Sequence, residues 1–148
     1  PIAIMFLLTA CRSDAKSDKP ILAANYITGE VLNEIAVPSA VEKNLDSIEL
    51  YYDIDEAMIS DMSMYICASG AYPDEITVFV LSDKSHADSV LLAMQKRLDY
   101  QISLFKDYTP NEMYKLDNAV LKSNGRYVYL IACEDNSKAD EIIKKLIN

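Results

Sequence analysis

Apolar positions recur every three or four residues in two long segments of the chain. In residues 84–108 they form one stripe, which consists of Ala87, Leu91, Met94, Leu98, Ile102, Phe105 and Tyr108. In residues 20–36 they are Ile21, Ala24, Thr28, Val31 and Ile35, with Pro20 in the first turn and Pro38 after the end. This spacing is typical of a helix that turns one face to a core. Both segments, and residues 137–147, are predicted to be helices.

Four shorter runs have the composition of β-strands. They cover residues 64–68, 75–81, 119–122 and 126–133 and are rich in β-branched and aromatic side chains. The Ser69–Asp74 segment is predicted to be a loop, and Asn124-Gly125 the turn of a hairpin. A capping-box pattern at Thr109-Pro110-Asn111-Glu112 predicts a short helix over residues 110–114. Residues 55–62 are assigned to another short helix.

These elements follow the order ββαββα after a helical lead-in. The order predicts an α+β fold with a four-stranded, largely antiparallel sheet and helices packed on it. Both long strands are apolar on both faces, whereas a sheet open to water on one side would alternate apolar with polar residues. We therefore expect both faces to be covered. The helices that begin at residues 84 and 137 can cover one face, and the 20–36 helix, the 40–62 segment, a partner or a ligand the other.

The amino end has the pattern of a secretion signal. Residues 2–8 are uncharged and apolar, too short a run to cross a bilayer, which takes about 20 residues. They suit the apolar core of a signal peptide. Because the chain begins at Pro1 without Met or a basic leader, we interpret residues 1–10 as a signal peptide that lacks its first residues.

The tetrapeptide Leu8-Thr9-Ala10-Cys11 resembles a bacterial lipobox. In that motif the cysteine thiol receives a lipid whose acyl chains, such as palmitate, hold the protein in the membrane. The resemblance implies lipidation of Cys11 and a location on the outer face of the cytoplasmic membrane. A chance cysteine behind a packed helix is the alternative. Residues 11–19 would then be the lipidated cysteine and a polar tether of at most about 30 Å, followed by a single domain over residues 20–148.

Composition narrows the classes of function. The 148 residues are 51% apolar and 25% charged, as in one folded domain. A net charge of −9 argues against nucleic-acid binding and against flat adsorption to anionic lipid. One His and three Cys leave little for a zinc site or a Ser-His-Asp triad, and the acidic runs lack the spacing of a calcium loop. We expect no metal, no cofactor and no enzymatic activity.

Cys67 and Cys133 both lie in apolar, strand-like runs. A buried free cysteine behaves as a small hydrophobic residue. We predict two free thiols, with a disulfide as the alternative outside the cytoplasm.

Three motifs resemble a known family. They are Ala68-Ser69-Gly70-Ala71 with Asp74-Glu75-Ile76-Thr77-Val78-Phe79, the helix-to-loop set Arg97, Gln101, Phe105, Tyr108, Pro110 and Glu112, and Arg126-Tyr127-Val128-Tyr129-Leu130. The family is an uncharacterised lipoprotein family of Bacillota, domain of unknown function 4358. The likeness covers about Leu45 to Ile147 and implies location and ancestry, with no activity or catalytic residue to carry over.

One polar pair interrupts the apolar stripe of the long helix. On a helical wheel Gln101 falls inside the stripe and Arg97 at its edge. A buried amide must find a hydrogen-bond partner. We predict that Gln101 bonds to backbone near Ser69–Asp74. We predict that Arg97 lies within reach of an acid, such as Asp74 or Glu75, or of a carbonyl.

That pair also defines the candidate site. In the structural interpretation it ties the helix to the loop. In the functional one it lines a small polar pocket with Ser69, Gly70 and Tyr108. The expected function is an extracytoplasmic, membrane-anchored binding domain for an envelope protein, and the alternative is capture of a small ligand near Arg97 and Gln101. The sequence identifies neither partner nor ligand.

Overall fold

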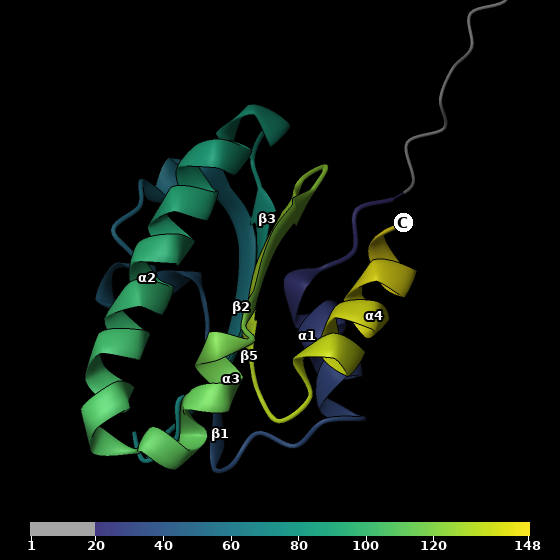
Figure 1. The fold of residues 1–148 in the computed structure, drawn as a ribbon. Helices are drawn as coiled ribbons and strands as arrows, with labels where there is room; N and C mark the ends of the chain where they lie inside the picture. The colour runs from purple at the N-terminus through teal and green to yellow at the C-terminus, as the bar shows by residue number, and fades with distance from the viewer. Residues whose placement is uncertain (1–19) are drawn as a thin grey trace, which may run out of the picture.

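The computed structural model describes residues 20–148, which form one five-stranded sheet with helices on both faces (Figure 1). All neighbouring strands are antiparallel, in the spatial order β1-β2-β3-β5-β4. The strands are β1 (Ala40–Lys43), β2 (Ile59–Cys67), β3 (Glu75–Leu81), β4 (Val120–Asn124) and β5 (Tyr127–Ala132). Every residue of β3 and β5 is buried, which suits their β-branched and aromatic side chains.

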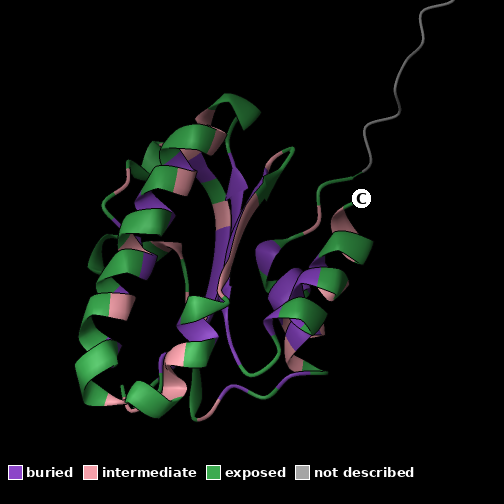
Figure 2. Ribbon diagram, viewed as in Figure 1, coloured by how far each residue is buried: buried purple, intermediate pink, exposed green. Residues whose placement is uncertain are grey.

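One face of the sheet is covered by α2 (Ala87–Tyr108) and α3 (Met113–Asp117). Beside them pack two 3₁₀ turns of the β1–β2 connection, Leu45–Leu50 and Glu56–Met58. Phe79 of β3 and Met94 of α2 are fully buried in this core. The buried sides of the helices face the sheet in Figure 2 and their outer sides are exposed, as amphipathic helices require.

The other face is covered by α1 (Ala24–Leu32) and α4 (Asn136–Ile147). Ile76, Val78 and Val80 of β3 point to this side, alternating with Phe79 and Leu81 on the first. Two sheet residues hold the start of α1: the Tyr127 hydroxyl accepts from Leu22 N at 2.7 Å, and the Asp61 carboxylate accepts from Ala24 N at 2.7 Å. The expectation that both faces are covered is confirmed.

The sheet has five strands, so the prediction of four is wrong. The missed strand, β1, has four residues, three of them exposed, and forms the edge of the sheet. Short, polar edge strands carry little hydrophobic pattern, because only one side of them meets a core. β2 also begins at Ile59, which pairs with Leu81, so only Glu56–Met58 of the helix expected at residues 55–62 is helical.

The long predicted helices are present, but their bounds and the faces of the sheet that they cover differ from the prediction. α1 covers Ala24–Leu32 rather than residues 20–36. At its start the backbone of Ala23 is extended and Leu22 N donates to the Tyr127 hydroxyl. The helices predicted at residues 84 and 137 lie on opposite faces, not together. The strands before them, β3 and β5, are antiparallel neighbours. The two helices therefore leave the sheet from opposite ends, and they pack on different faces. A 3₁₀ turn at Pro110–Glu112 followed by α3 stands where the short helix was expected.

The hairpin between β4 and β5 turns at Gly125-Arg126, one residue after the predicted Asn-Gly pair. Asn124 pairs with Tyr127, and Gly125 has a φ of +60°. Glycine takes positive φ without steric cost, and a two-residue hairpin turn needs such a position.

Cys67 and Cys133 are buried free thiols, which confirms that prediction. The proposed signal peptide, Cys11 and the tether lie outside the described residues. Within residues 20–148, no helix combines the length and the apolar composition that a membrane span needs.

Candidate functional site

The carboxylate of Glu75 is the centre of a buried polar cluster. Glu75 begins β3, in the middle of the sheet, and its side chain is fully buried beneath α2. Its Oε2 accepts from Gln101 Nε2 at 2.8 Å and from Arg97 Nε at 3.0 Å, and Arg97 Nη2 lies 2.9 Å away. Gln101 and Arg97 lie one turn apart on α2, so both reach the same oxygen.

The other oxygen of Glu75, Oε1, accepts hydrogen bonds from side chains outside α2. Oε1 accepts from the Tyr52 hydroxyl and, at 3.0 Å, from Thr77 Oγ1. Burial, followed by the negative charge of Glu75, raises the pKa of Tyr52. Burial alone would lower the pKa of Arg97, but the Glu75 carboxylate raises it on balance. Both oxygens are thus held by side chains from three parts of the chain: the β1–β2 connection, β3 and α2.

The cluster agrees with the structural interpretation of the polar pair and corrects the predicted partner of Gln101. Gln101 is only 6% exposed, as the helical wheel requires. It bonds to the Glu75 side chain, not to backbone near Ser69–Asp74. Arg97 reaches an acid, one of the two kinds of partner that were predicted for it. The sequence does not single out Tyr52, because nothing local indicates that its hydroxyl would meet a carboxylate 23 residues away.

The remaining residues of the candidate pocket have other surroundings. Ser69 bonds within its own loop, with its Oγ 3.1 Å from Cys67 Sγ and accepting from Ala71 N at 3.3 Å. Gly70 has a φ of +64° in that loop, where glycine is favoured. Tyr108 is 68% exposed and turns its ring edge-on to Phe105. Apolar residues that repeat about every 3.5 positions shift around the axis of a straight α-helix by about 20° per heptad. After three heptads, the last of them, Tyr108, has therefore left the buried face.

A second polar cluster lies at the end of the sheet that carries the β2–β3 loop. Lys115 of α3 is buried, 2.8 Å from an Asp74 oxygen and 2.8 Å from Glu112. Its ammonium also lies 5.4 Å from the ring of Tyr72 and 5.8 Å from that of Tyr114, distances at which cation–π attraction operates. Burial raises the pKa of Asp74 despite the bond to Lys115. The sequence does not indicate this cluster, because a lysine in a short helix is usually exposed.

The two cysteines differ in environment. Burial raises the pKa of Cys133 to about 11. Burial also acts to raise the pKa of Cys67, but the Ser69 hydroxyl and loop amides lower it on balance. Among residues 20–148, no group of three or more His, Cys, Asp and Glu side chains is placed to hold a metal ion.

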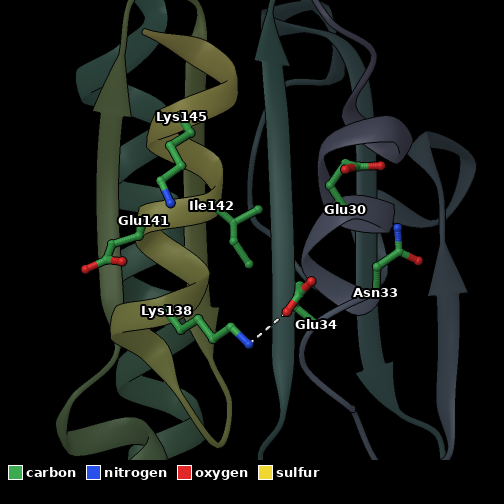
Figure 3. A pocket seen from close by; sticks show the side chains of 7 residues that line it. All are labelled: Glu30, Asn33, Glu34, Lys138, Glu141, Ile142 and Lys145. Carbon is green, nitrogen blue, oxygen red and sulfur yellow. Dashed lines mark hydrogen bonds and ion pairs between the residues drawn. The ribbon is translucent and has the colours of Figure 1, made fainter.

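A charged groove of about 460 Å³ lies between α1 and α4 (Figure 3). Glu34 of α1 and Lys138 of α4 form an ion pair of 2.9 Å across it, and Glu30, Glu141 and Lys145 lie along its walls. Pockets for small molecules are mostly apolar with a few placed polar groups. This groove is largely charged and has only Ile142 as an apolar side chain in its lining.

The outer face of α2 carries exposed apolar side chains. Tyr100 is 58% exposed, Leu104 47% and Tyr108 68%, and they lie one turn apart along the second half of the helix. We call these three residues the outer stripe of α2. The sequence pattern missed it, because the stronger buried stripe of the same helix dominates the spacing.

Comparison with models of protein families assigns the chain to a family. Residues 36–133, which run from just before β1 to just after β5, match the model of a domain of unknown function (DUF4358). The chain belongs to this family. The DUF4358 match begins earlier and ends earlier than the likeness expected over Leu45 to Ile147. Helices α1 and α4 both lie outside it.

Other comparisons add no activity to the DUF4358 assignment. No curated protein matches the chain, and no solved structure matches it. In this DUF4358 chain, Glu75, Arg97, Gln101 and Tyr52 all lie within the matched residues, so the buried polar cluster belongs to the family domain itself.

Proposed function

We propose that this chain is a lipid-anchored, extracytoplasmic domain without enzymatic activity that binds another protein of the cell envelope. The lipobox-like Leu8-Thr9-Ala10-Cys11 supports the anchor and the location. The outer stripe of α2 supports the binding role. The partner would be a protein with an apolar helix or strand that can pack on Tyr100, Leu104 and Tyr108.

The outer stripe is the observation that carries this proposal. A monomeric soluble domain seldom exposes several large apolar side chains next to one another, and contiguous apolar patches mark interaction sites. Tyrosine is enriched in protein interfaces, because its ring buries large area and its hydroxyl stays hydrogen-bonded. Two of the three residues are tyrosines, and the third is a leucine between them.

The Glu75 cluster, by contrast, we assign to folding rather than to ligand capture. Its two carboxylate oxygens are already bonded to Tyr52, Thr77, Arg97 and Gln101. A ligand that entered would have to displace one of these buried partners, and leaving a buried polar group unpaired costs about 1–3 kcal/mol.

The anchor is tested by fractionation. The full-length protein, with a complete leader, and its Cys11→Ala variant are expressed in a Gram-positive host. We expect the wild type in the membrane fraction with a mass increase the size of a lipid, and the variant in the soluble fraction. Equal solubility of the two proteins, without a mass difference, would contradict the anchor.

The binding role is tested by site-specific photo-crosslinking in intact cells. A crosslinking side chain at Leu104 is expected to give one defined adduct with a membrane or envelope protein. The same group at Lys84, far along the chain from the outer stripe, serves as the control. Replacing Tyr100 by Lys should remove the adduct without changing the unfolding midpoint. Equal adducts from positions 84 and 104 would count against the outer stripe as the docking surface.

A further inference from the structure

The polar cluster around Lys115 brings an amine and two carboxyl groups to one point. Lys115 Nζ lies 2.8 Å from Asp74 Oδ2 and 2.8 Å from Glu112 Oε2. Asp74 directly precedes β3, whereas Lys115 lies in α3, 41 positions further along the chain. The contact therefore joins the central strand of the sheet to a helix that packs on it.

The Lys115–Asp74 pair is withdrawn from water. The two side chains are 5% and 0% exposed, and the rings of Tyr72 and Tyr114 lie 5.4 Å and 5.8 Å from the ammonium group. Asp74 Oδ1 is buried and has no hydrogen-bond partner among the described residues. Buried carboxylate oxygens are normally bonded, so this site stabilises the ionised form of Asp74 incompletely.

The other lysines that pair with acids in residues 20–148 have different surroundings. Their side chains are 42% to 61% exposed, so water competes for both partners. Arg97 pairs with Glu75 in the core, but a guanidinium group keeps its proton and is not a nucleophile. Within the described chain, Lys115 with Asp74 is thus the ion pair that combines burial with an amine.

Burial also favours the neutral forms of this pair. It raises the pKa of Asp74, and it acts to lower the pKa of Lys115, although Asp74 and Glu112 raise that pKa on balance. The resting amine is therefore protonated, and it becomes nucleophilic when its proton crosses the 2.8 Å bond to Asp74. This transfer removes two charges from a dry site, where charges are costly. A reaction that occurs once per molecule needs only a small neutral fraction.

We propose that Lys115 and Asp74 join in an intramolecular amide bond, formed by the chain itself with Glu112 as proton carrier. The lone pair of neutral Nζ attacks Cγ of the protonated Asp74 carboxyl group, which forms the C–N bond. Glu112 takes a proton from Nζ and passes it to the hydroxyl group on Cγ. The C–O bond then breaks and one water leaves, so nothing is oxidised or reduced and Glu112 ends ionised.

The surroundings suit this single modification. A carboxylate at hydrogen-bond distance from the reacting nitrogen is placed for general acid–base catalysis, as Glu112 is here. Glu134, whose side chain is 70% exposed, lies 3.9 Å from Nζ, so the released water is formed next to solvent. The product would link the start of β3 to α3 and restrict the unfolded chain, as a disulfide does. This inference depends neither on the anchor nor on the docking surface proposed above.

Peptide mapping of the purified, folded full chain tests the bond. Trypsin cuts after lysine, so Asp74 falls in the peptide of residues 44–84, and a modified Lys115 stays uncut in the peptide of residues 107–122. We expect these two peptides as one joined species, one water lighter than their sum, and fragmentation that places the link at Asp74 and Lys115. Water loss confined to a single peptide, as from a cyclised aspartate, would overturn the proposal.

Two variants are matched to the mechanism. Glu112→Gln keeps a polar side chain of the same length but cannot carry the proton, and it should slow formation of the joined species by about a hundredfold or more. Lys122→Arg alters another lysine, 2.6 Å from an aspartate but 42% exposed, and should leave the joined species unchanged. Formation at the wild-type rate in Glu112→Gln would overturn the mechanism.

The wild-type chain itself keeps the test decisive if a variant does not fold. Folded wild-type protein is held at neutral pH for several days and then denatured, digested and mapped. Separate peptides cut after Lys115, with no joined species at any time, would overturn the proposal and leave Lys115 and Asp74 as an ion pair only. Accumulation of the joined species in folded protein, and its absence when the chain is kept in denaturant, is the expected result.

Discussion

At the scale of single residues, the buried carboxylate of Glu75 has four hydrogen-bond partners, which are Tyr52, Thr77, Arg97 and Gln101. A buried carboxylate without partners would be very costly, and this one is stabilised by one positive charge and three neutral donors. The donors come from separate parts of the chain, so the cluster also sets how α2 sits on the sheet. Removing one partner leaves the carboxylate buried and less well bonded.

For Gln101→Ala we therefore expect a loss of about 1–3 kcal/mol of unfolding free energy, measured by urea denaturation. Gln95→Ala is the matched control: Gln95 is exposed on the same helix and bonds only to Asp99 at 2.8 Å, and its change should stay within about 0.5 kcal/mol. Partner binding by the folded fraction should be unaffected in both. Equal destabilisation by the two changes would contradict the structural role of Gln101.

Asp140 should make stability depend on acid pH. Burial acts to raise its pKa, but bonds from Lys122, Lys144 and Tyr129 lower the pKa on balance below the ordinary value of 3.8. A carboxylate whose pKa is depressed by folding stabilises the protein fully above that ordinary value and loses the effect as the pH falls below it. The difference in unfolding free energy between wild type and Asp140→Asn should thus be largest near neutral pH and shrink below about pH 4. Asp107→Asn, an exposed change on α2, should give a flat difference; a flat difference for Asp140→Asn would refute the argument.

Among the elements, α1 depends on the sheet for its stability. It has nine residues, includes Gly29, and its N-cap residue Ala23 makes no side-chain bond to the helix. Asp61 of β2 supplies that bond from outside, and the hydroxyls of Thr28 and Ser63 lie 2.8 Å apart. A helix this short is marginal alone, so its docking and its formation are one event.

Gly29→Ala is accordingly expected to stabilise the protein by about 0.5–1 kcal/mol. A Cβ at Gly29 would meet no atom within 4 Å, and its φ is not in the positive region. Gly125→Ala is the contrast, because φ there is +60° and a Cβ would be strained although space is open. Thermal unfolding should show a higher midpoint for the first variant and a lower one for the second; a lower midpoint for Gly29→Ala would contradict this account of α1.

In the whole molecule, the stable unit is larger than the family match. Residues 36–133 contain the entire sheet and the helices of one face. Within residues 20–148, the other face, with Ile76, Val78, Val80 and Ile131 buried on it, is covered mainly by α1 and α4. A sheet with an open apolar face exposes an aggregation-prone surface.

A chain of residues 36–133 alone should therefore aggregate or bind a hydrophobic dye, whereas residues 20–148 should unfold cooperatively. Size-exclusion chromatography and denaturant unfolding of the two chains measure this. A monomeric, cooperatively folded 36–133 chain would show that α1 and α4 are dispensable.

The predictions from sequence succeeded where a periodic pattern reports directly on burial. The two-sided apolar composition of Ile76–Leu81 and Tyr127–Cys133 correctly indicated central strands, and the apolar stripe of residues 84–108 correctly indicated a long helix. The edge strand β1 was missed because an exposed strand of four residues has no such pattern. The choice of face for α4 was wrong for a related reason, since an amphipathic stripe shows that a helix is buried without showing against which face.

Sequence alone thus determined most of the local elements, the burial of Gln101 and the need for a polar partner there, because these follow from helical geometry and from the cost of an unpaired buried amide. Only the tertiary structure decided that Glu75 is the shared partner, that Tyr52 donates to it, and that Asp61 caps α1. These contacts join residues more than 20 positions apart. Their side chains meet through the register of β2, β3 and β5, and no local spacing encodes that register.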